Sequence, residues 1–231
     1  MNTPDPSLIA SMPLFADFDR EALAEFLGLG QSRLVVRSQH VFSQDQEAEA
    51  FYLLLDGYVR IELVRPNGEV VIVRFASTGE LMGIAPALGR DTYPANSVAV
   101  VDCVVLGWPC SVWADTVRRY PSFATAASQT IGTRLQEAHD RIAEMATAQV
   151  EQRIASALLR LANQSGRKTS DGILIDFPIS RQDLSEMTGT TLHTVSRTLS
   201  AWERRNIVRS GRKRIEILSG HQLLLIAEGR T

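Results

Sequence analysis

The stretch TGTTLHTVSRTLSAWE, residues 188–203, has a polar side that is suited to recognising another molecule. If it is helical, His193, Ser196 and Arg197 lie at positions i, i+3 and i+4 and share one face. The apolar residues fall on the other face: Val195, Leu199 and Trp202. A face of short hydrogen-bonding groups is unusual where a helix meets only water. The pattern predicts a helix that is buried on one side and binds a polar partner on the other.

A shorter helix, RQDLSEM, is expected directly before this one. Ser180 can cap its first turn, with Asp183 as the partner in a capping-box-like arrangement. Gly189 can end it, because a left-handed backbone conformation is cheap for glycine. Thr190 or Thr191 then caps the second helix. Two helices joined by a short turn containing glycine form a helix-turn-helix.

A basic segment follows the second helix. The residues IVRSGRKRIEIL read as two short strands around Ser210-Gly211, and four basic residues cluster at their tip: Arg209, Arg212, Lys213 and Arg214. From Ser180 to Thr231 the chain has 9 Lys/Arg and 5 Asp/Glu, although its overall net charge is −2. A basic carboxyl-terminal part on an acidic body favours contact with nucleic acid.

These features together predict binding of double-stranded DNA. The second helix of a helix-turn-helix enters the major groove, where Arg197 can donate two hydrogen bonds to a guanine. His193 either donates to a guanine or contacts a phosphate, and backbone N–H groups at a helix start suit phosphate oxygens. The expected DNA contacts are Ser180, Arg181, Thr190, Thr191, Leu192, His193, Ser196, Arg197, Arg212 and Lys213. The alternative is a solvated helix in a peripheral helical domain.

The amino-terminal half reads as strands. Residues 59–64 and 70–75 are rich in β-branched side chains and flank Asn67-Gly68, a strong hairpin signal. Gly57 stands where FYLLLDG must turn, and further strands are expected at 34–42 and 98–107. Many short strands with regular turns predict an antiparallel roll or barrel.

Helices are expected after Pro121. Five apolar residues repeat with spacings of four and three, as in the seam of a coiled coil: Ile131, Leu135, Ala138, Ile142 and Met145. We interpret them as a dimer seam, and the alternative is a helix that lies on its own roll. A second amphipathic helix is expected over residues 150–162, followed by a loop, NQSGRKTSDG.

The composition and the absence of certain motifs argue against membrane proteins, disulfide-rich proteins, iron–sulfur proteins and enzymes. No apolar run approaches the roughly 20 residues of a membrane helix, and the first residues, MNTPDPSLIASMPLF, lack a basic segment followed by an apolar one. A cytoplasmic protein without membrane contact is therefore expected. The two cysteines, Cys103 and Cys110, are too few for a disulfide framework or a four-cysteine iron–sulfur cluster. Neither a nucleophile elbow nor a phosphate-binding loop motif is present, so we expect no enzyme.

ISRQDLSEMTGTTLHTVSRTLSAWERRNIV resembles the DNA-binding helices of the CRP/FNR transcription regulators, and FYLLLDGYVRI and STGELMG resemble their β-roll. The resemblance implies an α+β fold: a cyclic-nucleotide-binding-type β-roll sensor domain (1–120), a dimerisation helix (121–146) and a winged helix-turn-helix (147–231). It also implies a homodimer on a palindromic site, RNA polymerase as a partner, and control by a small-molecule or gas effector.

The effector is where this chain departs from the family pattern. Members that bind cyclic AMP have a Glu and an Arg-Ser pair for the ligand, and these positions are occupied here by Ile84 and by Pro94-Ala95. Neither replacement supplies the charged donors that a cyclic phosphate needs, so cyclic-nucleotide binding is not expected. YPANSVAVVDCVVLGWP and TTLHTVSRTLSAWE resemble the branch that regulates nitrite and nitric oxide reductases, which implies a nitric-oxide response through haem.

Several residues are candidates for the effector site. His40 or His139 is a candidate axial haem ligand, and the alternative for each is an ordinary surface or packing histidine. Met82, Ile84, Leu88 and Tyr93, with His139, are candidates to line an apolar effector pocket, and a plain β-roll core is the alternative. Cys103 is expected in the core, Cys110 nearer the surface, and His221 in a capping-like role after the wing. The remaining alternatives are sensing of another small ligand or redox state, and a regulatory nucleotide-binding module without DNA contact.

Overall fold

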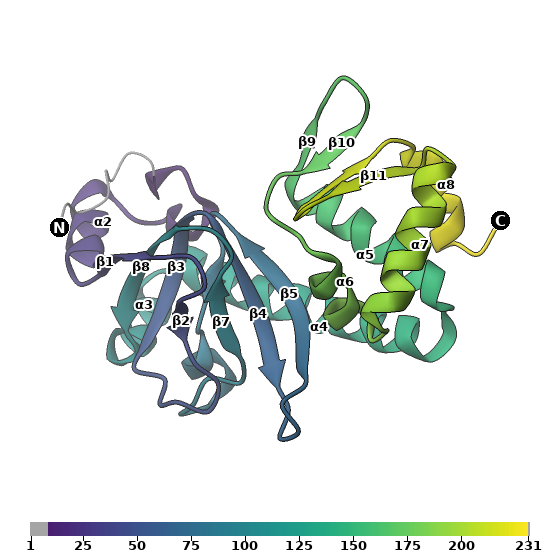
Figure 1. Cartoon of the computed structure of the whole chain (residues 1–231). Coiled ribbons are helices and arrows are strands. Elements are labelled where there is room, and N and C mark those ends of the chain that lie inside the picture. Colours follow the sequence, from purple (N-terminus) through teal and green to yellow (C-terminus); the bar gives the residue numbers. More distant parts are fainter. Residues whose placement is uncertain (1–8, 231) are drawn as a thin grey trace. The chain divides into compact units, whose positions relative to one another are not determined.

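The computed structural model describes residues 9–230, and the chain forms two compact units (Figure 1). The first unit contains residues 9–64 and 75–138, and the second contains residues 65–74 and 139–230. The first eight residues, part of the segment in which no leader pattern was found, lie outside the described residues, as does Thr231. Within the described range, no helix has both the length and the apolar character that crossing a membrane requires.

The first unit is the predicted antiparallel roll. The strands of the roll form two four-stranded sheets with the orders β1-β8-β3-β6 and β2-β7-β4-β5, although residues 70–74 of β5 are grouped with the second unit. The strands are β1 (Gln31–Val35), β2 (His40–Phe42), β3 (Ala50–Asp56), β4 (Tyr58–Val64), β5 (Val70–Ser77), β6 (Leu81–Met82), β7 (Asn96–Ala99) and β8 (Cys103–Pro109). Gly57 makes the turn from β3 to β4 with φ +97°, and an added Cβ would lie 2.7 Å from Cys103 Sγ, so glycine is required there.

Two predicted strands are each interrupted. The expected strand over 34–42 is β1 and β2, separated at Ser38, which has φ 68°. The expected strand over 98–107 is the end of β7 and most of β8. The two breaks bind each other, because Ser38 N donates to Ala99 O (2.8 Å) and Arg37 N donates to Asp102 Oδ1 (2.8 Å). These contacts join segments that are distant in sequence, so a local pattern does not reveal the breaks.

Aromatic side chains fill one core of the first unit. Trp108 on β8 is fully buried; its Nε1 donates to Phe26 O (2.8 Å), and its ring stacks on Phe26 (4.8 Å) and Phe51 (5.5 Å). Phe26 comes from α2 (Arg20–Gly28), a helix that was not predicted from the sequence, and neither was α3 (Trp113–Arg119). Short 3₁₀ turns complete the unit: Pro13–Phe15, Ala85–Leu88 and Cys110–Val112.

Two helices lead to the carboxyl-terminal part of the chain. The predicted long helix is α4 (Pro121–Thr147), whose first turns bury Phe123 and Ala127 in the aromatic core. The second is α5 (Val150–Ser165), whose buried face consists of Ile154, Ala155, Ala157, Leu158 and Leu161. It extends beyond the predicted end, and the expected loop NQSGRKTSDG also contains strand β9 (Gly166–Lys168), so only its last residues are a loop. A strand of three exposed residues leaves no apolar alternation to read.

The second unit contains a four-stranded sheet with the order β11-β12-β10-β9. Its remaining elements are β10 (Ile173–Ile175), α6 (Arg181–Thr188), α7 (Leu192–Arg204), β11 (Val208–Gly211), β12 (Arg214–Ile217) and α8 (Gly220–Ala227). The helix α8 packs on α5, and α6 packs on α7 (Figure 1). The β11–β12 hairpin is the wing of a helix-turn-helix, so the predicted order of elements is present.

Candidate DNA-binding interface

The capping groups predicted for α6 are in place. Asp183 N donates to Ser180 Oγ (3.0 Å), and Ser180 N donates to Asp183 Oδ2 (2.7 Å), which completes a capping box. Gly189 ends the helix in the left-handed region with φ 59°. Between the two possible caps of α7, the structure selects Thr191, whose Oγ1 accepts from Thr194 N (3.1 Å). Thr190 instead accepts, through its carbonyl oxygen, from Ser185 Oγ (2.6 Å).

The two faces of α7 differ as the sequence predicts. Val195, Leu199 and Trp202 are buried, and they fix the helix in the second unit. His193 and Arg197 are exposed and Ser196 is half-buried. These polar side chains and the start of α5 line a shallow groove, which includes Val150, Glu151, His193, Ser196, Arg197 and Arg204. The groove places the basic side chains Arg197 and Arg204 on an accessible surface.

The first residue of α7 is apolar and exposed. Leu192 retains 46% of its accessible surface, although a leucine in the first turn of a helix has no local need to face solvent. It stands at the helix end that a helix-turn-helix directs toward base edges. An apolar side chain there can contact the methyl group of a thymine but cannot hydrogen-bond a base.

The wing departs from the prediction in its register. The strands pair through Ser210↔Ile215 and Gly211↔Arg214, so the turn is made by Arg212 and Lys213 and not around Ser210-Gly211. Arg212 and Lys213 are exposed, and Lys213 has φ 56°. The hairpin therefore presents two adjacent cations at its tip.

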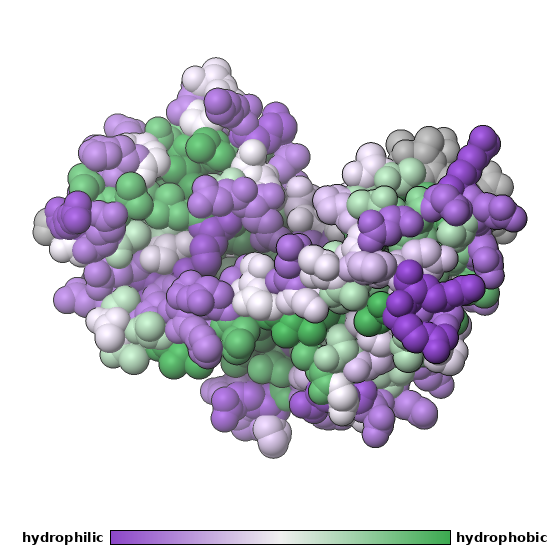
Figure 2. Space-filling view, turned by 180° about the vertical axis from the view of Figure 1, so that it is seen from behind, coloured by the Kyte–Doolittle hydropathy of each residue, from purple (hydrophilic) through white to green (hydrophobic). Residues whose placement is uncertain are grey.

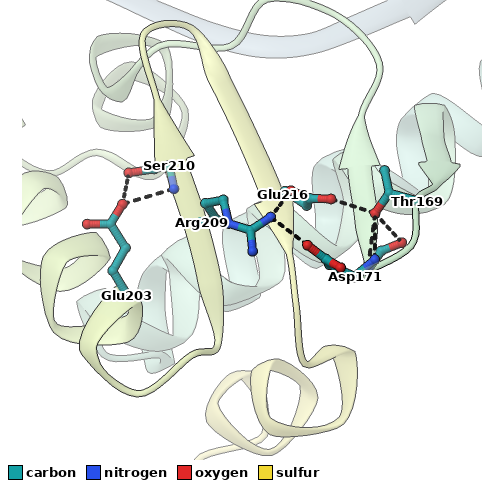
Figure 3. Close-up of polar contacts among 7 residues, drawn as sticks. Thr169, Asp171, Glu203, Arg209, Ser210 and Glu216 are labelled. Atoms are coloured by element: carbon teal, nitrogen blue, oxygen red, sulfur yellow. Dashed lines mark hydrogen bonds and ion pairs between the residues drawn. The ribbon is translucent and has the colours of Figure 1, made fainter.

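Arg209 is not part of that tip. Its Nη1 pairs with Glu216 Oε2 (2.9 Å) on the neighbouring strand and with Asp171 Oδ2 (3.0 Å) in the β9–β10 loop (Figure 3). The Thr169 hydroxyl donates to the other oxygen of Glu216. The prediction that Arg209 lies at the tip is wrong, because Asp171, which is distant in sequence, pairs with it.

Arg181 is also held by a neighbour. Its Nη2 donates to Ser210 Oγ (3.0 Å), so the first residue of α6 touches the wing strand β11. The Ser180 hydroxyl, in turn, is engaged in the α6 cap. Glu203 accepts from Ser210 as well, a contact that was not predicted from the sequence.

Comparison with known proteins agrees with these two units. Residues 33–120 match the cyclic nucleotide-binding domain family, and residues 152–226 match the Crp-like helix-turn-helix domain family. The chain belongs to the CRP/FNR family of transcriptional regulators. It is a CRP/FNR-type DNA-binding transcriptional regulator with an α+β fold.

Individual members of the family align along most of the chain. A cyclic AMP receptor protein from Thermus thermophilus is 29% identical over 217 residues, which cover 94% of this chain and 97% of that protein. The nitrogen fixation regulation protein FixK from Bradyrhizobium diazoefficiens is 24% identical over 200 residues, covering 87% and 83%. The structure of FixK2 from Bradyrhizobium japonicum is 21% identical, has a TM-score of 0.75, and covers 85% of this chain and 96% of that one.

In this CRP/FNR chain, the candidate effector residues lie in different local surroundings. Met82 and Tyr93 belong to one core cluster and Ile84 to another, whereas Leu88 is 47% exposed and His139 is exposed on α4. Core packing, the alternative considered for these residues, accounts for the three that are buried. A pocket lined by these residues together with Leu88 and His139 stays a prediction.

Aromatic rings pack beside Gly83 and Pro94 in this chain. Tyr93 stacks on Phe42 with ring centroids 4.2 Å apart, and its hydroxyl donates to Ala50 O (2.6 Å). An added Cβ on Gly83 would lie 3.1 Å from the Tyr93 ring. Burial raises the pKa of Tyr93 well above its usual value, so the phenol stays neutral.

The histidines and cysteines lie in ordinary surroundings. His40, the first residue of β2, is exposed, and its Nδ1 lies 2.9 Å from Ser43 Oγ. Cys103 is buried on β8, as expected, and Cys110 is half-buried; burial raises the pKa of both thiols. His221 does not cap α8, because Ser219 occupies the cap position. Within residues 9–230, no three His, Cys, Asp or Glu side chains are grouped so as to hold a metal ion.

Proposed function

We propose that this regulator acts as a homodimer that reads a palindromic DNA site, with α7 of each subunit in the major groove of one half-site. The observation that carries the proposal is the exposed face of α7, where His193, Ser196 and Arg197 stand together above a fully buried apolar face. Arg197 has the donor geometry for a guanine, and the cations at the wing tip suit neighbouring phosphates. The proposed contacts are Ser180, Arg181, Thr190, Thr191, Leu192, His193, Ser196, Arg197, Arg212 and Lys213.

The proposed contacts do not all act in the same way. The Ser180 hydroxyl and the Thr191 hydroxyl are engaged in helix caps, so the backbone N–H groups of these helix starts, and not those hydroxyls, are the donors we assign to phosphate. Arg181 touches the wing while its side chain stays half-buried. The side chains assigned to base edges are therefore Leu192, His193, Ser196 and Arg197.

The dimer proposal rests on the second half of α4. Leu135, Ile142 and Met145 are 55%, 67% and 42% exposed, and they repeat with the spacing of a coiled-coil seam together with Ile131 and Ala138. Single exposed apolar residues are normal on a protein surface, and Figure 2 shows hydrophobic residues exposed between hydrophilic ones. The regular spacing on one helix, and not exposure alone, favours a partner helix.

For the effector, we propose a nitric-oxide response through haem, on the strength of the two segments that resemble the nitrite and nitric oxide reductase regulators. His40 and His139 are both exposed, whereas a haem ligand lies in a pocket that controls access to the iron. The exposure of both histidines does not itself favour haem, so the proposal rests on sequence resemblance alone. A visible spectrum of protein purified without oxygen tests it: a Soret band that shifts with nitric oxide supports haem, and protein that stays colourless after reconstitution contradicts it.

Two observations bear on the alternatives. The raised pKa of both thiols keeps them protonated at neutral pH, which disfavours redox sensing by Cys103 or Cys110. The residues at the positions compared with cyclic-AMP-binding members, Ile84 and Pro94-Ala95, supply no charged donor for a cyclic phosphate. Sensing of another small ligand by the same architecture is therefore the second candidate. A nucleotide-binding module without DNA contact is disfavoured by the basic wing tip.

The experiment that tests base reading compares Arg197→Ala with Arg118→Ala. Arg118 is an exposed arginine on α3 in the first unit and serves as the matched control. We expect Arg197→Ala to weaken binding to the cognate site by about 1–3 kcal/mol and to relax the preference at one base pair. Arg118→Ala should change neither the affinity for the cognate site nor the base-pair preference. Equal losses on cognate and random DNA in Arg197→Ala would contradict base reading by this residue.

A further inference from the structure

One carboxylate links the wing strand β11 to the recognition helix α7 through hydrogen bonds. Glu203, in the last turn of α7, accepts through Oε1 from Ser210 N (2.9 Å) and from Ser210 Oγ (2.5 Å). β11 is the edge strand of its sheet, so an outward N–H group on it has no neighbouring strand to bind. Glu203 supplies that missing acceptor.

The Ser210 hydroxyl joins three elements. It donates to Glu203 on α7 and accepts from Arg181 Nη2 on α6 (3.0 Å), while its own strand is β11. Each of these elements carries residues that we assign to DNA: Arg181 at the start of α6, the exposed face of α7, and the tip that follows β11. One hydroxyl therefore links the three parts of the proposed interface.

The opposite face of β11 is held by a different set of charges. Figure 3 shows the side chains of Ser210 and Arg209 leaving the strand on opposite sides, the first toward Glu203 and the second toward Glu216 and Asp171. Glu216 is 3% exposed, and its register partner is Arg209. Strand β11 is thus fixed on both faces, and only the turn at Arg212 and Lys213 projects free of these contacts.

The fold alone does not explain a glutamate at position 203. Val195, Leu199 and Trp202 already bury the inner face of α7. A carboxylate beside a surface that binds a polyanion repels it, which costs affinity. Residues 180–231 contain only 5 acidic residues, and this one is placed between the recognition helix and the wing.

We propose that Glu203 is a positioning residue: it fixes the wing to the carboxyl-terminal end of α7, so that α7 meets bases and the tip meets phosphate in one register. The inference rests on the proposed DNA-binding function. It assigns no DNA contact to Glu203 itself. Its effect on DNA acts through the position of Lys213 in the turn of the wing.

Two substitutions separate positioning from charge. In Glu203→Gln, the amide oxygen still accepts from Ser210 N, whereas Glu203→Ala removes the acceptor; both remove the negative charge. Loss of charge alone strengthens DNA binding in both variants. Positioning predicts that Glu203→Gln binds at least as tightly as the wild type, and that Glu203→Ala binds more weakly, by about eightfold at 0.1 M salt if one phosphate contact is lost.

A double-mutant cycle with Lys213→Asn gives a readout that a loss of stability would not change. Asparagine tolerates the left-handed conformation of Lys213. We expect Glu203→Ala and Lys213→Asn each to lower the salt slope of binding by about 0.9, and the double variant to lower it little further. A wild-type slope in Glu203→Ala, or fully additive slopes, would overturn the proposal.

Hydrogen exchange without DNA distinguishes failure of this inference from failure of the proposed function. In Glu203→Ala the amides of residues 209–214 should exchange faster, while those of buried α7 residues should not. If Glu203→Ala is poorly folded, Ser210→Ala replaces it, because this variant keeps the backbone bond to Glu203 and should show a smaller effect of the same kind. If the amides of the wing exchange at the wild-type rate, the positioning role of Glu203 is contradicted, even if DNA binding is confirmed. If they exchange faster but the protein binds no specific DNA site, the positioning role is supported and the proposed function is contradicted.

Discussion

Lys213 occupies the turn of the wing with φ 56°, exposed and beside Arg212. A cation at such a tip contributes to DNA affinity through phosphate and not through base identity. We expect Lys213→Asn to weaken binding to cognate and random DNA alike and to lower the salt slope by about 0.9. Titrations at several salt concentrations measure this, and a slope equal to that of the wild type would exclude Lys213 from phosphate contact.

Glu216 and Asp171 make the stability of the second unit sensitive to acid. The Thr169 hydroxyl and then the Arg209 guanidinium hold the pKa of Glu216 below its usual range, and the hydrogen bond from Arg209 does the same for the pKa of Asp171. A lowered folded-state pKa adds stability above the unfolded value of about 4, and this stability is lost as the pH falls through the folded value. We therefore expect the free energy of unfolding to decrease below about pH 4, and less steeply in Glu216→Gln.

Urea unfolding between pH 3 and pH 7 measures this dependence. Glu137→Gln, at an exposed position of α4, is the control and should keep the acid dependence of the wild type. An equal acid dependence in Glu216→Gln and the wild type would show that the Arg209 cluster does not contribute to it.

At the scale of elements, the seam on α4 gives the sharpest test. Leu135→Glu places two like charges opposite each other in a symmetric pair of helices and removes about 1.5–3 kcal/mol of apolar burial per subunit. We expect this variant to sediment as a monomer and to bind DNA weakly. Thr133→Glu, at an exposed position off the seam, should remain dimeric. If Leu135→Glu is a stable dimer, the seam lies elsewhere.

The elements that the sequence predicted best are those with strong local signals. The cap at Ser180, the left-handed Gly189 and the buried stripe of α7 each follow from neighbouring residues. The exposed strand β9 and the breaks between β1 and β2 and between β7 and β8 depend on contacts between distant segments, which local patterns do not contain.

The candidate site divides in the same way. Helical spacing was enough to place His193, Ser196 and Arg197 on one face. The pairing of Arg209 with Asp171, 38 residues away in sequence, and the contact between Arg181 and Ser210, 29 residues apart, depend on the fold of the whole unit. The only local sign of the Glu203 contact was an acidic residue in an otherwise basic segment.

At the scale of the whole molecule, charge is divided along the chain. Residues 180–231 carry 9 basic and 5 acidic residues, within a chain whose net charge is −2. Such a distribution directs the carboxyl-terminal part of each subunit to DNA while the rest is not attracted. Dimerisation through α4 would bring two basic carboxyl-terminal parts to the DNA. It would also impose two-fold symmetry on the DNA site that the protein binds.

The most direct test of the account is a footprint of the purified protein on DNA selected from genomic fragments. We expect a protected palindrome whose half-sites are about one helical turn, roughly 34 Å, apart. Arg197→Ala should lose that protection, and Arg118→Ala should keep it. Selected fragments without two-fold symmetry, or protection that survives in Arg197→Ala, would contradict the proposal that two recognition helices read one site.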